Sequence, residues 1–401
     1  MVTPAPRYPR GSVGHSHVIV GAGFSGCVMA RLLVERGLGR VLVIEKRDHL
    51  GGNCHDYVDE HGIVVHRYGP HLFHTENQRV VELLSRFTEF EPYEHRVQAS
   101  IEGRLVPLPF NLSSIEACFD PDSAGEIVAA LVGEYGEGSQ VPILELRQNP
   151  SSPLRRLADF VYDNVFLDYT SKQWGCRPED VNPEVTARVR VRVSRDGRYF
   201  RDSFQQVPTR GYSRIFAGLL DHPDIDVELS TPASAVLGHD ARTGGLRLFG
   251  NAFAGHLVYT GSIDELFDYR YGELSYRSLD LRLEYHDRNW LQPCAVVNHP
   301  SAPGFTRVTE FKHIHRMSNT ATGSVTMTEY PRAYDRCDPA RDVPFYPCFR
   351  RESMERYERY RSHAETFANI TLLGRLAEYR YYDMDDAVAR ALDVFETRFQ
   401  P

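Results

Sequence analysis

The chain has 401 residues, 42% of them hydrophobic and 25% charged, which is typical of a soluble globular protein with two or three domains. Its formal net charge of −8 argues against a general nucleic-acid binder. Seven cysteines are scattered without a Cys-x-x-Cys pair, so the sequence indicates neither a zinc site nor a disulfide framework.

Residues 1–14 contain prolines and arginines but no apolar core of a signal peptide, so we expect a disordered tail. No apolar run approaches the length of a membrane span. The cysteines are expected to be reduced thiols. Together these features predict a cytoplasmic protein without a metal.

Residues 17–45 have the pattern of a dinucleotide-binding unit. A β-branched run at 18–20 predicts a buried strand, and it enters the turn Gly21-x-Gly23-x-x-Gly26, which opens an apolar-periodic helix. A second strand, at 41–44, ends in Glu45, which is placed to bind a ribose hydroxyl. The helix N-terminus then supplies N–H donors to a pyrophosphate.

The residues after Glu45 distinguish between two dinucleotides. Lys46 and Arg47 are followed by Gly51-Gly52-Asn53, and this glycine pair suits a second close approach of the backbone to a long, extended ligand. This favours FAD over NAD.

The segment 62–66 predicts a strand that leads into a Gly-Pro turn flanked by histidines. His71 and His74 are either a metal pair or, as we favour in the absence of further ligands at a familiar spacing, part of a loop packed against a flavin ring. Thr75 and Gln78 predict a capping box for the helix that follows.

The middle of the chain predicts a hairpin, then helices, then a basic strand. Residues 93–110 alternate around Glu102-Gly103, and a helical pattern runs from Ser113 to about Trp174. Residues 188–193 (RVRVRV) predict a strand with Arg188, Arg190 and Arg192 on one face. That face is either solvated or turned toward an anion.

The last part of the chain returns to the dinucleotide unit. Short strands are expected at 225–229, 246–249 and 256–260. The last of these runs into Gly261, as does the later strand of the dinucleotide-binding domain in many flavoproteins, so the domain is expected to be discontinuous. Residues 276–350 add alternating segments. Asp383 is a credible N-cap for a final helix that starts at Met384.

These segments together resemble the UDP-galactopyranose mutase family over nearly the whole chain, from about His15 to Pro401. The resemblance is carried by long ordered motifs: GAGFSG, EKRDHLGGN, GIVVHRYGPHLFHT, YTSKQW, YTGSIDELFDY, TRVTEF and YYDMDDA.

The resemblance implies an α/β fold with a discontinuous Rossmann-like FAD-binding domain, a small helical domain and an antiparallel-sheet domain. The FAD-binding domain is expected at 15–90, 208–268 and 360–401, the helical domain at 111–180, and the sheet domain at 91–110, 181–207 and 269–359. A homodimer is also implied.

The implied reaction is the ring contraction of a nucleotide sugar. In the family the flavin is active when reduced, and its N5 is the covalent nucleophile at the anomeric carbon as UDP leaves. NAD(P)H or another reductant is the implied electron source.

The family's functional positions carry over onto matching residues. Arg188 resembles the loop arginine that closes on the substrate diphosphate, Arg307 the second diphosphate arginine, and His71 the histidine beside the flavin ring. The implied substrate-binding residues are Tyr169, Trp174, Tyr199, Phe200, Arg277, Tyr346, Tyr381 and Asp383. The implied cofactor-binding residues are Gly21, Gly23, Phe24, Ser25, Gly26, Glu45, Lys46, Arg47, Gly52, Asn53, His71, Gly374, Arg375, Asp383 and Met384.

The chain departs from the family pattern at several of these motifs. Val165 stands where an aromatic residue is expected near the base, Arg190 replaces a loop proline, Leu373 replaces a glycine, and Lys312 and Ile314 differ from the family's EFRHF. The sequence is compatible with three functional hypotheses. The protein is a UDP-galactopyranose mutase, a mutase of the same mechanism that acts on another nucleotide sugar, or an amine-oxidase-like flavoprotein oxidase. An inactive flavin-binding relative is a further alternative.

Overall fold

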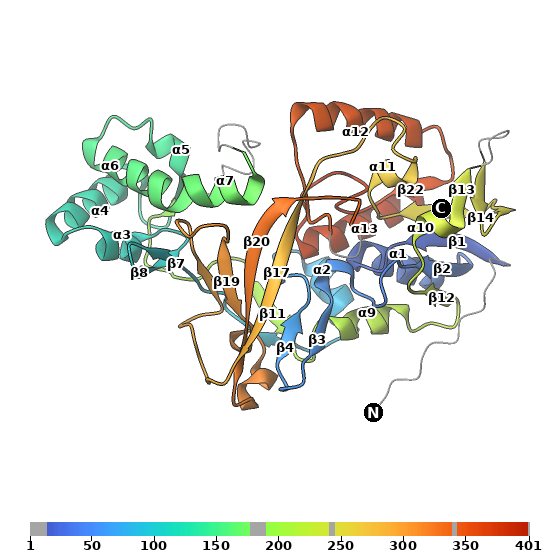
Figure 1. Cartoon of the computed structure of the whole chain (residues 1–401), viewed down its shortest axis with the longest axis horizontal. Coiled ribbons are helices and arrows are strands. Elements are labelled where there is room, and N and C mark those ends of the chain that lie inside the picture. The colour runs from blue at the N-terminus through green and yellow to red at the C-terminus, as the bar shows by residue number, and fades with distance from the viewer. Residues whose placement is uncertain (1–13, 177–189, 240–244, 339–342, 400–401) are drawn as a thin grey trace.

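The computed structural model describes residues 14–176, 190–239, 245–338 and 343–399 (Figure 1). Arg188 and all of the tail expected at residues 1–14 except Gly14 lie outside these ranges. A parallel sheet occupies one end of the molecule, a mainly antiparallel sheet lies beside it, and a group of helices forms the other end (Figure 1). The α/β class predicted from the sequence is confirmed.

Five parallel strands from three distant stretches of the chain form the first sheet. Their order is β12 (Ile225–Glu228), β2 (Arg40–Ile44), β1 (His15–Val20), β16 (His256–Tyr259) and β22 (Ile370–Leu372). The strands predicted at 18–20, 41–44, 225–229 and 256–260 are therefore confirmed. Ile19 packs into one core and Val18 into another, so both faces of the sheet are buried and its strands read as continuous apolar runs.

Helices cover both faces of this sheet. One face packs against α1 (Phe24–Glu35), α9 (Ser213–Leu220) and α13 (Met384–Arg398). The other packs against α10 (Ala233–Val236), α11 (Ile263–Leu266), α12 (Arg351–Ala364) and a small sheet of β13 (Leu237–His239), β14 (Leu246–Leu248) and β15 (Asn251–Ala252). Asp383 caps α13 as predicted, and its backbone N–H donates to the Asp386 carboxylate at 3.0 Å.

The turn between β1 and α1 is possible only with glycine. Gly21 has a φ of 101°, and a Cβ at Gly26 would lie 2.0 Å from the carbonyl oxygen of Gly21. That oxygen belongs to the backbone, so it cannot move aside as a flexible side chain could. The absence of a side chain at Gly26 lets the first turn of α1 pack directly against the backbone at the end of β1.

The second sheet has seven strands and a single parallel pair. Its order is β21 (Tyr346–Pro347), β17 (Tyr276–His286), β20 (Ser324–Ala333), β19 (Arg307–Glu310), β18 (Val296–Asn298), β7 (Val97–Ile101) and β8 (Arg104–Leu108), with β18 and β7 parallel. The predicted hairpin is β7–β8: Glu102 and Gly103 both have positive φ, as a type I′ turn requires.

The helices at the far end pack on this second sheet. They are α3 (Leu112–Cys118), α4 (Pro121–Tyr135), α5 (Ile143–Leu146), α6 (Ser152–Val161), a π-helix (Tyr162–Leu167) and α7 (Asp168–Trp174). The helical pattern predicted from Ser113 to about Trp174, with a loop at 148–153, missed one strand. Strand β9 (Gln140–Pro142) interrupts the helices because it pairs antiparallel with β10 (Arg190–Arg192).

Two small sheets connect these parts: β3 (Asp56–Val58) with β4 (Val64–His66), and β5 (Phe73–Thr75) with β11 (Phe204–Pro208) and β6 (Phe90–Pro92). The capping box predicted for α2 (Gln78–Leu84) is wrong. Asn77 is the N-cap and accepts the Arg79 N–H at 3.1 Å. Thr75 instead donates its hydroxyl to Asp385 at 2.7 Å, which joins β5 to the start of α13.

Two helical glycines make a matched test of this packing. We expect Gly26→Ala to lower the free energy of unfolding by at least about 2 kcal/mol because its methyl group meets backbone. Gly125, in α4, has open space around its Cβ position, so Gly125→Ala is expected to raise stability by about 0.5–1 kcal/mol. Urea unfolding of both variants checks this, and similar effects at the two sites would contradict the packing described.

Candidate functional site

Two cavities meet at one place in the molecule. The first, here called the glycine cavity, lies at the turn between β1 and α1, and the second, the arginine cavity, lies between α7, β10 and the second sheet. Both are lined by His71, Arg375, Asp383 and Met384. A ligand that fills the glycine cavity can therefore touch one held in the arginine cavity.

The glycine cavity brings together every residue that the sequence predicted to bind a cofactor. They are Gly21, Gly23, Phe24, Ser25, Gly26, Glu45, Lys46, Arg47, Gly52, Asn53, His71, Gly374, Arg375, Asp383 and Met384. Gly23 is the N-cap of α1 and no side chain caps the helix, so its first N–H groups face the cavity unblocked.

Glu45 is held at the end of β2 by two backbone donors. One carboxylate oxygen accepts the Ala22 N–H and the other the Arg47 N–H, each at 2.9 Å. A carboxylate offers about four acceptor positions, so two remain for ribose hydroxyls. Arg47 donates to Asn53 at 2.8 Å, and its buried Nη1 makes no hydrogen bond to the described residues. These donors and acceptors fit a dinucleotide.

The arginine cavity contains most of the predicted substrate residues. Its walls include His71, Tyr169, Tyr199, Phe200, Arg307, Tyr346, Tyr381 and Asp383. Arg188 lies outside the described residues, and Trp174 and Arg277 are not among the residues that line the cavity.

Arg307 owes its orientation to a buried partner that sequence reasoning missed. Its Nε lies 2.7 Å from the carboxylate of Glu329, which faces it across the β19–β20 pair. Burial is the largest single influence on Arg307 and lowers its pKa, but the Glu329 carboxylate, together with Tyr169 and Tyr346, more than offsets burial, so the pKa of Arg307 lies well above its usual value. A fixed guanidinium in a cavity wall suits the binding of a phosphate.

Tyrosines supply uncharged donors beside this guanidinium. The rings of Tyr346 and Tyr381 stack with centroids 6.1 Å apart, and the Arg375 guanidinium lies over both. Burial raises the pKa of Tyr346 to about 12, and it also raises that of Tyr169. Both phenols therefore keep their protons at neutral pH.

His71 presents an acceptor where the two cavities meet. Its Nδ1 lies 2.8 Å from the Gly69 carbonyl oxygen, which only accepts, so the proton sits on Nδ1. Burial, with the charges of Arg375 and Arg307, lowers the pKa of His71 to about 4. The ring is thus neutral and its Nε2 is an acceptor. His74, the other member of the predicted pair, bonds Asp202 at 3.0 Å and stacks on Phe200.

Arg277 and Lys172 hold the helix that carries Tyr169 and Trp174. Arg277 donates to the carbonyl oxygens of Gln173 and Lys172, at 2.8 and 2.9 Å, so it caps the C-terminus of α7. Lys172 donates to three carbonyl oxygens of the segment 299–305, at 2.8–2.9 Å. Sequence reasoning missed Lys172, because these partners lie more than 120 residues away in the chain.

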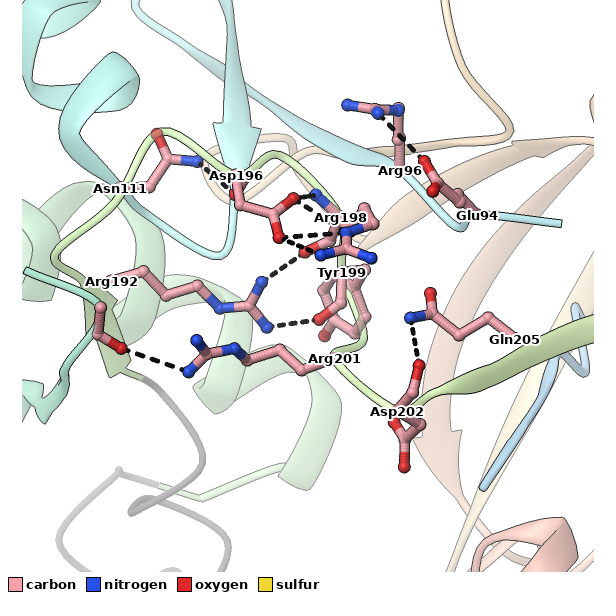
Figure 2. Close-up of polar contacts among 11 residues, drawn as sticks. Glu94, Arg96, Asn111, Arg192, Asp196, Arg198, Tyr199, Arg201, Asp202 and Gln205 are labelled. Carbon is pink, nitrogen blue, oxygen red and sulfur yellow. Dashed lines mark hydrogen bonds and ion pairs between the residues drawn. The ribbon is translucent and has the colours of Figure 1, made fainter. Parts of the chain in front are cut away.

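One alternative for the RVRVRV strand was that its arginines face solvent, and this prediction is wrong for Arg192. Its side chain is buried and donates to the carbonyl oxygens of Arg198 and Tyr199, the latter at 2.6 Å (Figure 2). Asp196 in turn pairs with Arg198 at 2.7 Å. Arg192 thereby fixes the segment that carries Tyr199 and Phe200, whereas Arg190 is exposed at the cavity rim.

Within the part of the chain that the structure describes, no helix combines the length and the apolarity needed to cross a lipid bilayer.

Comparisons with known proteins find relatives that cover most of the chain. A family model described as UDP-galactopyranose mutase matches residues 164–381, and one described as an NAD(P)-binding Rossmann-like domain matches residues 19–87. A probable UDP-galactopyranose mutase of Klebsiella pneumoniae is 37% identical over 377 residues, which cover 94% of this chain and 92% of that protein. A dTDP-fucopyranose mutase of Escherichia coli is 34% identical over 383 residues, covering 94% and 96%.

The fold is also found among solved structures. A crystal structure of reduced UDP-galactopyranose mutase matches with a TM-score of 0.71 and 16% identity, covering 96% of both chains.

Buried histidines of the site make stability depend on pH. Burial, with the charges of Arg307 and His74, lowers the pKa of His95 from 6.5 to about 3. Between these values the unfolded chain binds more protons than the folded one, so stability falls as the pH drops below 6.5. We expect His95→Gln to reduce the loss between pH 7.5 and 5 by about 2 kcal/mol in urea unfolding. The exposed His61→Gln is the control, and equal losses in both variants would contradict the prediction.

Proposed function

Because the chain belongs to the UDP-galactopyranose mutase family, we propose that it interconverts the pyranose and furanose forms of a nucleotide-linked sugar, with UDP-galactose as the first candidate. The observation that carries this proposal is the junction of the two cavities at His71, Arg375, Asp383 and Met384. A cofactor in the first cavity and a sugar nucleotide in the second are in contact only there.

FAD is the cofactor that the glycine cavity fits best in this proposal. The uncapped α1 and the donors of Arg47 suit the pyrophosphate, and the free acceptor positions of Glu45 suit a ribose. Reduced FAD, when bound, would supply a nucleophilic nitrogen to the anomeric carbon. NAD(P)H or another reductant, a homodimer and a cytoplasmic location belong to the same proposal.

The chain's own residues would hold the diphosphate while the sugar rearranges. Arg307 meets two phosphate charges with a guanidinium that Glu329 keeps protonated and oriented. The hydroxyls of Tyr346 and Tyr381 add donors without charge. Arg188 is proposed as a second guanidinium from the segment that precedes β10. Fixing the leaving group in place keeps it available for the return step.

A second candidate is a mutase of the same type that acts on a dTDP-linked sugar. The Escherichia coli relative named dTDP-fucopyranose mutase is nearly as similar to this chain as the Klebsiella pneumoniae one. Val165, where the sequence led us to expect an aromatic residue near the base, lies half-buried in the π-helix directly before α7. Val165 packs against the core of the helical end and does not line the arginine cavity, so this candidate is supported by the relative and not by the shape of the cavity.

The test of the proposal uses dithionite-reduced protein and a panel of sugar nucleotides. We expect the purified protein to bind FAD and to form a furanose product from UDP-galactose or dTDP-fucose only after reduction, because oxidised flavin lacks the nucleophilic lone pair. Chromatography of the products measures this, and whichever nucleotide turns over identifies the substrate. Peroxide production from an amine by the oxidised protein would favour the flavoprotein oxidase instead.

Arg307 gives the sharpest mutational prediction. We expect Arg307→Ala to lower kcat/KM by roughly 10- to 100-fold, since each charge-assisted hydrogen bond contributes about 1.5–3 kcal/mol. FAD content should be unchanged, and Arg307→Lys should restore only part of the loss because an ammonium lacks the planar fork. Arg282→Ala, an exposed arginine on the neighbouring sheet surface, is the matched control. Equal activity of Arg307→Ala and this control would contradict the assignment.

A further inference from the structure

Two buried histidines outside both cavities face each other behind the Gly69–His71 turn. His66 ends β4, and His315 lies between the short helices Phe311–His313 and Arg316–Thr320 that connect β19 to β20. Both residues are 1% exposed, and their Nε2 atoms are 3.0 Å apart. The His66 ring lies between the rings of Tyr212 and Phe311, with centroid distances of 5.6 and 5.5 Å.

The hydrogen bonds around His66 fix the position of each proton. The backbone N–H of His71 donates to Nδ1 of His66 at 3.0 Å, so this nitrogen is unprotonated. A neutral imidazole carries one proton, which must then sit on Nε2 and be donated to Nε2 of His315. Burial, aided by the neighbouring histidines, lowers the pKa of His66 well below its usual value. Burial also lowers that of His315 to about 4, partly offset by the Pro208 carbonyl.

The same tautomers argue against a metal at this place. Asp56 brings a carboxylate oxygen within 4.8 Å of the two rings, so three potential ligands converge. A metal on Nε2 of His66 would need the lone pair that the Nε2 proton occupies. Asp56 already accepts the backbone N–H groups of Tyr212 and Ser213, the second at 2.8 Å. The cluster is therefore a set of hydrogen bonds.

We propose that His66 and His315 are a positioning pair, whose hydrogen bond fixes the Gly69–His71 turn and through it the acceptor that His71 offers where the two cavities meet. Three segments are tied in sequence: the 311–320 connection to His66, His66 to the His71 backbone, and the His71 ring to the Gly69 carbonyl. Val64, two residues before His66, also donates its N–H to Ser318 of that connection at 3.0 Å. The second sheet thus sets the position of a turn that lines the glycine cavity.

The inference rests on the proposed function where it concerns FAD, but its first test does not need the cofactor. Asparagine places its oxygen where Nδ1 of histidine lies, and glutamine places its amide where Nε2 lies. His66→Asn therefore keeps the acceptor for the His71 N–H and loses the link to His315, whereas His66→Gln keeps the link and loses the acceptor. His315→Gln keeps an acceptor for His66, and His315→Leu removes it.

Hydrogen exchange at the His71 amide separates these variants. We expect exchange at His71 to be fastest in His66→Gln, about 10-fold or more above the wild type, because its acceptor is gone. His315→Leu and His66→Asn should each give a smaller increase, and His315→Gln should stay within about 2-fold of the wild type. His61→Gln, on the same β3–β4 hairpin but exposed, is the matched control. Wild-type exchange at His71 in both His315→Leu and His66→Gln would overturn the proposal.

FAD titration of the same variants tests the consequence at the cavity. We expect the dissociation constant of FAD to rise about 10-fold in His66→Gln and about 3-fold in His315→Leu, with shifted visible bands of the bound flavin. The double variant His66→Asn/His315→Leu should lose no more than the worse single variant, because both break one link. Additive losses would overturn the pair. Failure of the wild type to bind FAD would instead refute the proposed function and leave the exchange result standing.

Discussion

One guanidinium joins the two sheets on which the site is built. Arg375 follows β22 of the parallel sheet, and its Nε donates to the Tyr382 carbonyl oxygen at 3.1 Å, directly before α13. Its Nη1 donates to the carbonyl oxygen of Phe345 at 3.3 Å, at the start of β21 in the seven-stranded sheet. A planar fork with fixed donor directions holds both backbones at a set distance. The glycine and arginine cavities share a border because this side chain spans it.

The sequence predicted the glycine cavity well because its signal is local. Gly21, Gly26 and Glu45 lie within one strand–helix–strand unit. Gly21 makes the tight turn, Gly26 lets the helix approach the strand, and Glu45 ends the second strand beside that turn. Glu329 and Lys172 were missed for the opposite reason. The residues next to them in the sequence do not indicate a partner. Glu329 meets Arg307 only because β19 and β20 pair, and Lys172 meets the 299–305 carbonyl oxygens only because α7 packs beside that segment.

Sequence patterns also led to wrong predictions for side chains that can be either buried or exposed. Alternation in RVRVRV predicts the strand found at 190–192, but it does not distinguish the buried Arg192 from the exposed Arg190, since backbone carbonyl oxygens can replace water at the two Nη atoms of a buried guanidinium. Arg277 was assigned to the substrate site from the family resemblance, yet it donates to the open carbonyl oxygens at the end of α7. Thr75 and Gln78 have the spacing of a capping box, but Asn77 directly precedes α2, and its side chain accepts the backbone N–H of Arg79.

The order of strands in the parallel sheet has a consequence for how each molecule matures during translation. The edge of β1 that β16 covers stays open until residue 256 is made, and the wall formed by Gly374 and Asp383 follows only after β22. At about 5–20 residues per second, the ribosome needs on the order of half a minute to pass from Ile44 to Ile370. Throughout that time the glycine cavity lacks the wall that Gly374 and Asp383 form. Only a nearly complete chain can therefore close the glycine cavity around a ligand. A chain stalled before β22 leaves the apolar edge of β16 unpaired, and such an edge needs protection by chaperones.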